Sequence, residues 1–503
     1  MYNVIDYLKD SAEKYADKIA IIEEDKSITY MDFNERCKRA GSFLGSRNFF
    51  NEPVIMFMDK GIDTLTAFFG AVYAGCFYSL VNPEFPSNRI SSIKETLKAR
   101  VVITDEEHME LAKELFSGLD VYNVKELLEA DIDEDILDKA YVMHIDTDPL
   151  YVNFTSGSTG VPKGVAIAHR SVIEFIDIFT EIFKFKNEDI IANQAPFDFD
   201  VSVKDIFSSM KMGATLVIIP KKYFSSPAAL LDYICDHKIT TMTWAVSALC
   251  LVTTFHGLDY KCPDTVEKIL FSGEVMPMKH LKQWMEHLPD ATFVNLYGPT
   301  EITCNCTYHV IERDRDYDGK IPIGKAFPNE RIYLLDEEGK PVNEAGKPGE
   351  ICIAGNSVGI GYYNNEEQTK KAFINNPNVV AYKERIYKTG DLGFYNEAGE
   401  LIFNGRKDFQ VKYQGHRIEL EEVDKAIMDV DGVVRSCTIF DEEKSKLYGF
   451  YIGDMDKKEL NIKLHETMPV FMIPTYLIQR DEFPMTKNGK IDRKKLMEDR
   501  KKK

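Results

Sequence analysis

No stretch of this 503-residue chain is apolar enough to cross a bilayer, since no apolar run approaches the roughly 20 residues that a spanning helix needs. The N-terminus, residues 1–10, has acidic residues and no basic region, so we expect an amphipathic helix there rather than a secretory signal. Basic residues are the minority, with 62 Lys and Arg against 81 Asp and Glu and a formal net charge of −19. Because an acidic surface repels nucleic acid, the sequence predicts no nucleic-acid partner. The lack of a long apolar run predicts no membrane span.

The nine cysteines contain no Cys-x-x-Cys pair. Cys304 and Cys306, with His309 nearby, come nearest to a metal site, but their spacing matches no zinc pattern. Buried thiols on a strand are the favoured interpretation. An odd number of scattered cysteines is typical of a reducing compartment, so we predict a cytoplasmic protein.

The chain has no repeat and no low-complexity linker, and it is too long for one ordinary core. Strand and helix patterns alternate over residues 1–407, which predicts an α/β domain with parallel-rich sheets covered by helices. Short strands punctuated by Gly and Pro indicate a small β-rich subdomain at about 320–405. The remaining residues, 408–503, are predicted to form a small α+β C-terminal domain, with the boundary at Asp408.

The run Thr155–Gly164 follows an apolar segment, Leu150–Phe154, that we predict to be a buried strand. Small hydroxyl residues alternate with glycines and precede Lys163, and such a loop can fold its N–H groups and hydroxyls around phosphate oxygens. It is not a Walker A motif, because Lys163 is followed by Gly164 instead of Ser or Thr. Taken alone, the run is equally compatible with a plain flexible loop.

Five further stretches carry groups suited to chemistry. Phe197–Val203 would place Asp198 and Asp200 on one face if this region is extended. Each stretch singly is compatible with a turn, a hairpin or a solvated tail, but the ordered set together with the phosphate loop favours a nucleotide site. The other four stretches are Phe271–Val275, Asn295–Glu301, Tyr387–Leu392 and Gly489–Arg493.

With these motifs, residues 1 to about 497 resemble the adenylate-forming superfamily of acyl-CoA ligases, peptide-synthetase adenylation domains and luciferases. Asn193–Val203 and Ser272–Pro277 are most similar to the amino-acid adenylation branch, and within it to D-alanine–carrier-protein ligases. The resemblance implies that a carboxylate attacks the α-phosphate of ATP to give aminoacyl-AMP, and that a thiol then takes the acyl group. The sequence contains no carrier domain, so the expected acceptor is the phosphopantetheine thiol of a discrete carrier protein.

The resemblance also implies the roles of individual residues in binding ATP and Mg²⁺. Glu301 would carry Mg²⁺, and Asp391 would accept both ribose hydroxyls. Lys490 would bridge the substrate carboxylate and the α-phosphate, Arg417 would contact phosphate or ribose, and Asp408 would be the hinge of a mobile C-terminal domain. The other ATP-binding residues would be Thr155, Ser156, Gly157, Ser158, Thr159, Gly160 and Lys163 at the phosphates, with Gly273, Asn295, Tyr297 and Thr300 near the adenosine.

Asp200 matches the family position that pairs with the substrate ammonium, which favours an amino acid over a plain acid. Val201 and Leu296 would also line the substrate site. Ser272 stands where D-alanine ligases typically carry Cys, and Lys204 stands where they carry an apolar residue. Lys204 could meet an acidic substrate side chain, but the favoured interpretation is a stem packed at the pocket edge with its ammonium in water.

D-Alanine is the predicted substrate, with the enantiomer left open. The alternatives are an acyl-CoA synthetase-like ligase, an enzyme for another small or acidic amino acid, and a carrier-binding protein without catalysis.

Overall fold

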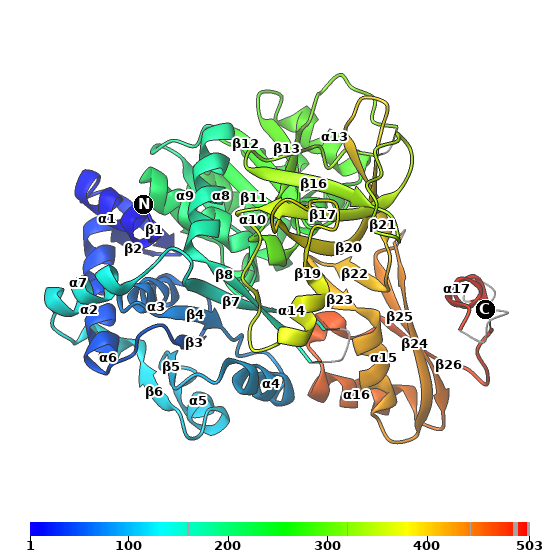
Figure 1. The fold of residues 1–503 in the computed structure, drawn as a ribbon, viewed down its shortest axis with the longest axis horizontal. Coiled ribbons are helices and arrows are strands. Elements are labelled where there is room, and N and C mark those ends of the chain that lie inside the picture. The colour runs from blue at the N-terminus through cyan, green and yellow to red at the C-terminus, as the bar shows by residue number, and fades with distance from the viewer. Residues whose placement is uncertain (158–160, 319, 443, 486–490, 500–503) are drawn as a thin grey trace. The chain divides into compact units, whose positions relative to one another are not determined.

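The structure is a computed structural model that describes all of the chain except residues 158–160, 319, 443, 486–490 and 500–503 (Figure 1). The chain divides into two compact units. The first unit comprises residues 1–83, 96–153 and 164–407, and the second comprises 84–95, 154–163 and 408–503. The sequence placed 84–95 and 154–163 in the N-terminal domain, whereas the structure groups both segments with residues 408–503.

The largest sheet of the first unit has nine strands. Its central strands, from β13 to β1, are parallel, and β2, β14 and β15 extend its edges in antiparallel pairing. In order across the sheet, the strands are β15 (Lys325–Ala326), β14 (Thr307–Val310), β13 (Thr292–Tyr297), β12 (Lys268–Ser272), β11 (Thr241–Ala245), β9 (Ile190–Asn193), β10 (Thr215–Ile218), β1 (Ile19–Glu23) and β2 (Lys26–Thr29).

A second sheet has seven strands, of which β4, β3, β5 and β6 are parallel neighbours. The predicted strand at residues 150–154 lies in this sheet, as do the apolar runs at residues 54–57 and 101–104. In order, the strands are β18 (Gly361–Tyr362), β8 (Lys163–Ala168), β7 (Pro149–Thr155), β4 (Phe77–Leu80), β3 (Pro53–Phe57), β5 (Val101–Thr104) and β6 (Asp120–Asn123).

Helices connect these strands, as parallel pairing requires. In chain order, the helices from the N-terminus through the nine-stranded sheet are α1 (Ile5–Lys14), α2 (Tyr30–Ser46), α3 (Ile62–Tyr73), α4 (Ser87–Leu97), α5 (Met109–Leu115), α6 (Val124–Leu128), α7 (Glu134–Met143), α8 (His169–Ile182), α9 (Val201–Met212), α10 (Pro227–Asp236), α11 (Val246–Thr254), α12 (Gly257–Tyr260) and α13 (Met278–His287). The short 3-10 turns η1 (Lys221–Ser225) and η2 (Thr300–Ile302) complete this part.

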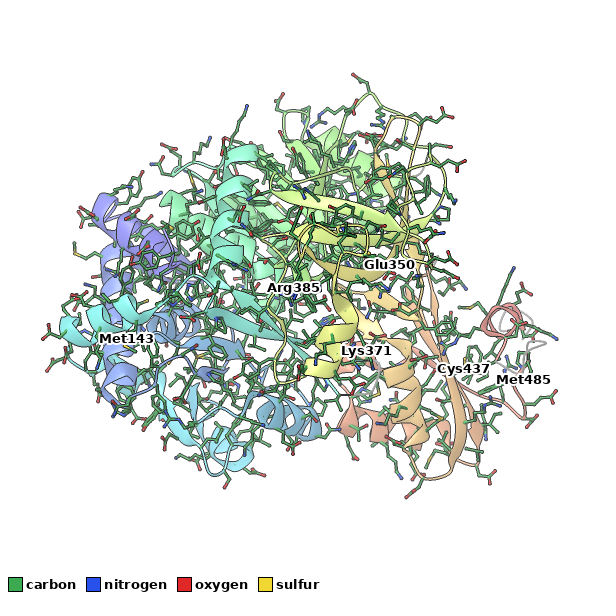
Figure 2. All side chains as sticks on the ribbon, viewed as in Figure 1. Met143, Glu350, Lys371, Arg385, Cys437 and Met485 are labelled. Atoms are coloured by element: carbon green, nitrogen blue, oxygen red, sulfur yellow. The ribbon has the colours of Figure 1, made fainter. Side chains whose placement is uncertain are left out.

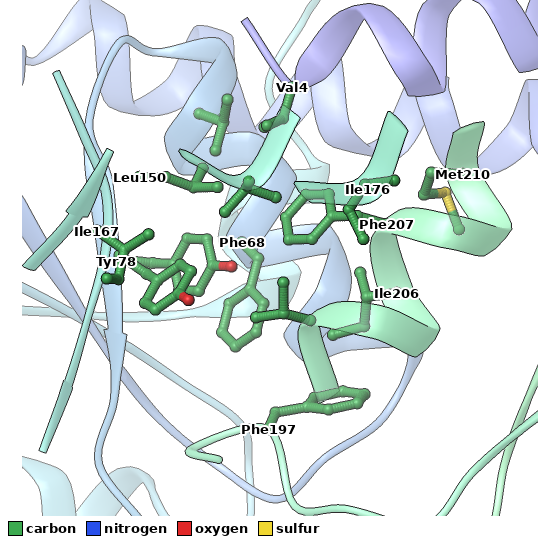
Figure 3. Packing of buried hydrophobic residues seen from close by; sticks show 14 of the residues in the cluster. Val4, Phe68, Tyr78, Leu150, Ile167, Ile176, Phe197, Ile206, Phe207 and Met210 are labelled. Carbon is green, nitrogen blue, oxygen red and sulfur yellow. The ribbon is translucent and has the colours of Figure 1, made fainter. Parts of the chain in front are cut away.

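Both faces of the nine-stranded sheet are buried. Along β12, Leu270 belongs to one core cluster and its neighbour Phe271 to the other, because successive side chains of a strand point to opposite faces. The cluster of Leu270 includes Phe207 and Met210 of α9 (Figure 3). The cluster of Phe271 includes Trp284 of α13. This double coverage is typical of parallel sheets.

The predicted β-rich subdomain is a five-stranded antiparallel sheet. Glu350, labelled in Figure 2, lies on its strand β17 and forms ion pairs with Lys388 and Lys407 at 3.4 and 3.2 Å. In order, the strands are β16 (Glu330–Leu335), β17 (Gly349–Gly355), β20 (Arg385–Tyr395) and β19 (Phe373–Asn375), with β21 (Leu401–Arg406) paired to β20 and α14 (Glu366–Ala372) nearby in the sequence.

The second unit has its own core around α15 and a three-stranded sheet. Cys437, labelled in Figure 2, is fully buried on the central hairpin of that sheet. The elements of the second unit after residue 408 are the strand pair β22 (Gln410–Tyr413) and β23 (His416–Glu419), and the sheet of β24 (Val433–Asp441), β25 (Lys446–Gly453) and β26 (Tyr476–Gln479). Its helices there are α15 (Leu420–Met428), α16 (Lys457–Thr467), η3 (Val470–Met472) and α17 (Arg493–Asp499).

These elements confirm the predicted α/β fold class with parallel-rich sheets covered by helices. Across the described part of the chain, none of the helices combines the length and the apolar character that a bilayer span requires. All nine cysteines are free thiols.

Candidate functional site

Four neighbouring strands of the nine-stranded sheet, β9, β11, β12 and β13, are parallel and therefore end at the same edge. Residues that the sequence singled out follow three of these ends: Asp200 after β9, Gly273 after β12 and Glu301 after β13. The carboxyl edge of such a sheet is the usual place for a ligand. The candidate site is built on this edge.

Tyr297 and Asp391 meet although they lie on different sheets. The Tyr297 hydroxyl donates a hydrogen bond of 2.5 Å to Asp391 Oδ2, and Arg406 pairs with Asp391 Oδ1 at 2.5 Å. Burial and the adjacent Asp391 carboxylate raise the pKa of Tyr297 well above its usual value, so the phenol stays a donor. The arrangement holds an anionic carboxylate at the edge where the sequence predicted the nucleotide sugar.

Glu301 is fully buried on η2, directly after the turn that follows β13. The Tyr362 hydroxyl donates to Glu301 Oε1 at 2.8 Å, and the Gly359 N–H donates to the Glu301 carbonyl at 2.8 Å. These bonds fix the residue from the 359–362 segment. A carboxylate held in this way offers the hard oxygen ligand that Mg²⁺ prefers, so its chemistry fits the predicted metal role.

Of the predicted adenosine-lining residues, Asn295 and Tyr297 lie on β13, whereas Gly273 directly follows β12 and Thr300 follows β13. Gly273 has φ +100°, a conformation that favours glycine, so the chain can turn directly after Ser272. The Asn295 amide donates to the Pro322 carbonyl at 2.9 Å, which makes it a brace for the 322 segment. Thr300 begins η2.

Asp198 and Asp200 were expected on one face only if residues 197–203 were extended, and the segment is not extended. Residues 197–200 form a turn, and Asp200 stands at the N-cap of α9 with φ −59° and ψ −26°. Its half-buried carboxylate makes no capping hydrogen bond. The turn places Asp200 at the start of a helix, where the backbone N–H groups favour negative charge. Val201 is the first residue of that helix, and Leu296 is buried in the core cluster on β13.

The favoured interpretation of Lys204, with its ammonium in water, is wrong. Lys204 is completely buried, and its Nζ donates to Asn305 Oδ1 at 3.0 Å and to Ser272 Oγ at 3.3 Å. Lys204 is four residues after Asp200, so the two side chains project from neighbouring turns of α9 on one face. Lys204 thus brings an ammonium to Ser272 at the end of β12, four residues after Asp200.

In the second unit, the phosphate-loop segment meets β23 and α15. The Ser156 hydroxyl donates to the Arg417 carbonyl at 2.6 Å, and the Gly157 N–H donates to Glu422 Oε2 at 3.2 Å. The Gly157 N–H is therefore directed at a carboxyl oxygen of the chain itself, and burial raises the pKa of that Glu422 carboxyl. Lys163 lies close enough to lower the pKa of Glu419, although burial raises that pKa overall.

Four predicted site residues, Ser158, Thr159, Gly160 and Lys490, lie outside the described residues. Thr155 ends β7, and Asp408 begins the last segment of the second unit, where its Oδ1 accepts from the Gln410 N–H at 3.3 Å. The binding roles and the hinge role of these residues stay predictions.

Sequence reasoning missed the partners that hold the site together, chiefly Asn305, Arg406 and Tyr362. Asn305 stands between two cysteines that drew attention only as metal candidates. Cys304 and Cys306 are buried thiols, and burial raises the pKa of Cys304 to about 12. The sequence offered only a weak signal for Asn305, namely a polar residue between two cysteines shortly after Glu301.

The chain matches the model of the AMP-binding enzyme family over residues 8–363. It is 32% identical over 514 residues to D-alanine–D-alanyl carrier protein ligase of Lacticaseibacillus casei, with 98% of each chain covered. It is 33% identical to bacitracin synthase 1 of Bacillus licheniformis over 97% of its own length, which is 9% of that protein's length.

Among solved structures, the adenylation domain AlmE of Vibrio cholerae, in complex with glycyl-adenosine-5'-phosphate, has a TM-score of 0.88 with this chain. The alignment covers 100% of this chain and 98% of that one, at 21% sequence identity. At this identity the likeness speaks for the fold, and it agrees with the predicted fold class.

Proposed function

Since this chain belongs to the AMP-binding enzyme family, we propose that it activates an amino acid with ATP as aminoacyl-AMP and passes the acyl group to the phosphopantetheine thiol of a discrete carrier protein. D-Alanine is the proposed amino acid. The L. casei relative, similar along its whole length, is a D-alanine–D-alanyl carrier protein ligase by name.

The observation that carries this proposal is the position of Asp200. Its carboxylate stands at the start of α9, on the sheet edge that also holds the Tyr297–Asp391 pair. A substrate ammonium would form a charge-assisted hydrogen bond with Asp200, whereas the hydrocarbon of a plain acid offers a carboxylate no such donor. Asp200 therefore supports an amino acid over the substrate of an acyl-CoA synthetase.

For the nucleotide, we propose that Asp391 accepts the ribose hydroxyls, Tyr297 stacks on the adenine, and Glu301 holds Mg²⁺. The cation would neutralise charge between phosphates. Ser156, Gly157 and Lys163, with the rest of the loop, would hold the β- and γ-phosphates. Arg417 would contact phosphate or ribose, and Asp408 would be the hinge. The nine free thiols support our proposal of a cytoplasmic location.

We expect the purified protein to catalyse amino-acid-dependent exchange between ATP and pyrophosphate, with D-alanine as the best substrate. Exchange reports adenylation alone, because pyrophosphate re-enters only through the acyl-adenylate. The measurement is a panel of D- and L-amino acids, with acetate and propionate as matched acids that lack the ammonium.

Three results distinguish the alternatives. Equal exchange with acetate and alanine would remove the ammonium-pairing role of Asp200 and favour an acyl-CoA synthetase, which thioester formation with free coenzyme A would then identify. If none of the acids supports exchange, a carrier-binding protein without catalysis is favoured. Exchange that depends on the ammonium supports the proposal, and the preferred enantiomer names the substrate.

The buried ammonium of Lys204 favours one second candidate, an enzyme for aspartate or glutamate. If Lys204 meets the substrate, acidic amino acids will outcompete alanine, and Lys204→Met will reverse that order. We expect alanine to win in both proteins, because Asn305 and Ser272 already accept hydrogen bonds from Lys204 within the chain. A clear preference for acidic substrates in the wild type would replace D-alanine in the proposal.

A further inference from the structure

Lys60 ties the two large sheets together at their functional edge. It lies between β3 of the seven-stranded sheet and α3, and its side chain reaches the end of β9 in the nine-stranded sheet. Its Nζ donates to the Gln194 carbonyl at 3.0 Å and to Asn193 Oδ1 at 3.1 Å. The carbonyl oxygens of Asn193 and Ala195 lie at 3.4 and 3.5 Å. One ammonium therefore gathers the carbonyls of three consecutive residues.

The Asn193 side chain connects Lys60 to α9 through a second hydrogen bond. Its Nδ2 donates to Asp205 Oδ2 at 3.0 Å, and Asp205 also accepts a hydrogen bond from Thr243 Oγ1 of β11. Gln194 is held separately, because its Oε1 accepts from the Ala245 N–H at 3.3 Å. The start of the 193–200 segment is thus fixed to β3, β11 and α9 at once.

The two charged ends of this network compensate each other. Asp205 is completely buried, and burial raises its pKa to about 7. Burial lowers the pKa of Lys60 to about 7, opposed by the charges of Asp205 and Asp198. Either group alone would be costly in this place, since an uncompensated buried charge is strongly destabilising. The Asn193 amide bridges them without direct contact.

The 193–200 segment is held at its start by the Lys60 network and further along by Phe197, whose ring packs against Phe68. Its own backbone supplies little order, since the Phe199 N–H to Pro196 carbonyl bond is a single turn. The segment ends at Asp200 and the first turn of α9. On the basis of the proposed function, we propose that Lys60 is a positioning residue of the amino-acid site, which fixes the 193–200 segment and thereby places Asp200 against the substrate ammonium.

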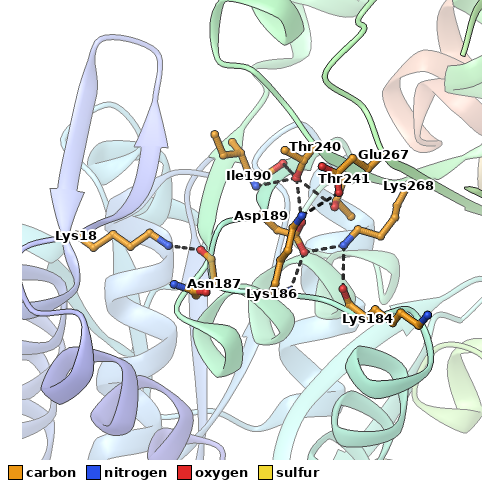
Figure 4. Close-up of polar contacts among 10 residues, drawn as sticks. All are labelled: Lys18, Lys184, Lys186, Asn187, Asp189, Ile190, Thr240, Thr241, Glu267 and Lys268. Atoms are coloured by element: carbon orange, nitrogen blue, oxygen red, sulfur yellow. Dashed lines mark hydrogen bonds and ion pairs between the residues drawn. The ribbon is translucent and has the colours of Figure 1, made fainter. Parts of the chain in front are cut away.

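Lys60→Met tests this role, and Lys18→Met is its matched control. Lys18 also binds carbonyls with a half-buried ammonium, those of Asn187 and Gly213, but these residues precede β9 and β10 at the opposite edge of the sheet; Figure 4 shows its bond to Asn187. In exchange assays, Lys60→Met should raise the KM for D-alanine about tenfold or more. Its kcat and its KM for ATP should stay near wild type, and Lys18→Met should change none of the three.

The pH dependence separates a role of the ammonium from simple packing. The charged groups that face Lys60 are Asp205 and Asp198. Because the pKa of Lys60 is near 7, the wild-type advantage in kcat/KM over Lys60→Met should be largest below pH 7 and should shrink as the ammonium loses its proton. Taking this ratio at each pH cancels the titration of the substrate. A ratio that is constant from pH 6 to 9 would overturn the role of the ammonium.

Hydrogen exchange tests the same anchor without any substrate. Lys60→Met should speed amide exchange within residues 190–205, while Lys18→Met should leave this region as in the wild type. If no amino acid supports pyrophosphate exchange in the wild type, the proposed function fails, and the positioning role fails with it. Faster amide hydrogen exchange in Lys60→Met would still show that Lys60 holds the 193–200 segment in place. An active wild type whose Lys60→Met variant keeps the KM for D-alanine would overturn the positioning role alone.

Discussion

Lys490→Ala is expected to slow the formation of aminoacyl-AMP by about 10²–10³, because one preorganised charge at the reacting centre typically contributes that much. If the family pattern holds, this compact cation would lie between the substrate carboxylate and the α-phosphate, where two anions must meet. Transfer to the carrier thiol from preformed aminoacyl-AMP should be far less affected, since that step no longer brings the two anions together. The two half-reactions are measured separately, by pyrophosphate exchange and by carrier loading.

Lys494→Ala is the matched control, since Lys494 is an exposed lysine at the start of α17. It removes the same charge a few residues away and should leave both half-reactions unchanged. An equal loss in both half-reactions for Lys490→Ala would contradict the role, because it would indicate a general effect on folding or on binding. A normal exchange rate in that variant would exclude Lys490 from adenylation.

The fold could be predicted from the sequence because its signals are local. Runs such as Lys268–Phe271 and Thr292–Asn295 are short, apolar and bounded by turn residues, and both are strands. The alternation of such runs with helical patterns leaves few arrangements besides parallel sheets covered on both faces. The change to Gly- and Pro-punctuated strands near residue 320 likewise predicted a small β-rich subdomain, and the structure has the antiparallel sheet of β17 and β20 there.

The candidate site could be predicted only where motif residues carry it. Tyr297, Glu301 and Asp391 were singled out because each stands in a recognisable motif. In the structure Tyr297 ends β13, Glu301 lies on η2 and Asp391 lies within β20. The orientation of Lys204 could not be found, since its environment depends on Asn305, about a hundred residues later in the chain. A lysine in an amphipathic helix usually extends to water, and only the tertiary structure shows that this one is enclosed.

The turn at residues 197–200 shows a second limit. The pattern Phe-Asp-Phe-Asp alternates as a strand does, yet Pro196 precedes it and α9 follows at Val201. A strand that continued through residue 203 would prevent α9 from starting at Val201. The helix is favoured because its apolar face packs into the core through Phe207 and Met210. The alternation was a poor guide because burial of the helix outweighs the local preference.

Asp200→Ala should remove most of the discrimination between alanine and propionate in the exchange assay. Loss of a hydrogen-bonded charge partner costs roughly 2–5 kcal/mol, and the half-buried position of Asp200 places the expected loss near the lower end, about 30-fold. The loss should fall on alanine, because propionate has no ammonium for Asp200 to bind. The KM for ATP should change little, since the residues proposed to hold the adenine and the ribose, Tyr297 and Asp391, lie on β13 and β20.

Asp200→Asn provides the matched comparison, because it keeps the shape and a hydrogen-bond acceptor and removes only the charge. If the charge selects the substrate, both variants will lose discrimination, and the asparagine variant will retain the larger part through its amide oxygen. If Asp200 serves only to start α9, asparagine will behave as wild type, since Asn and Asp are comparable at a helix N-terminus. In that event another group would have to select amino acids over plain acids, and the proposed role of Asp200 in binding the substrate ammonium would be rejected.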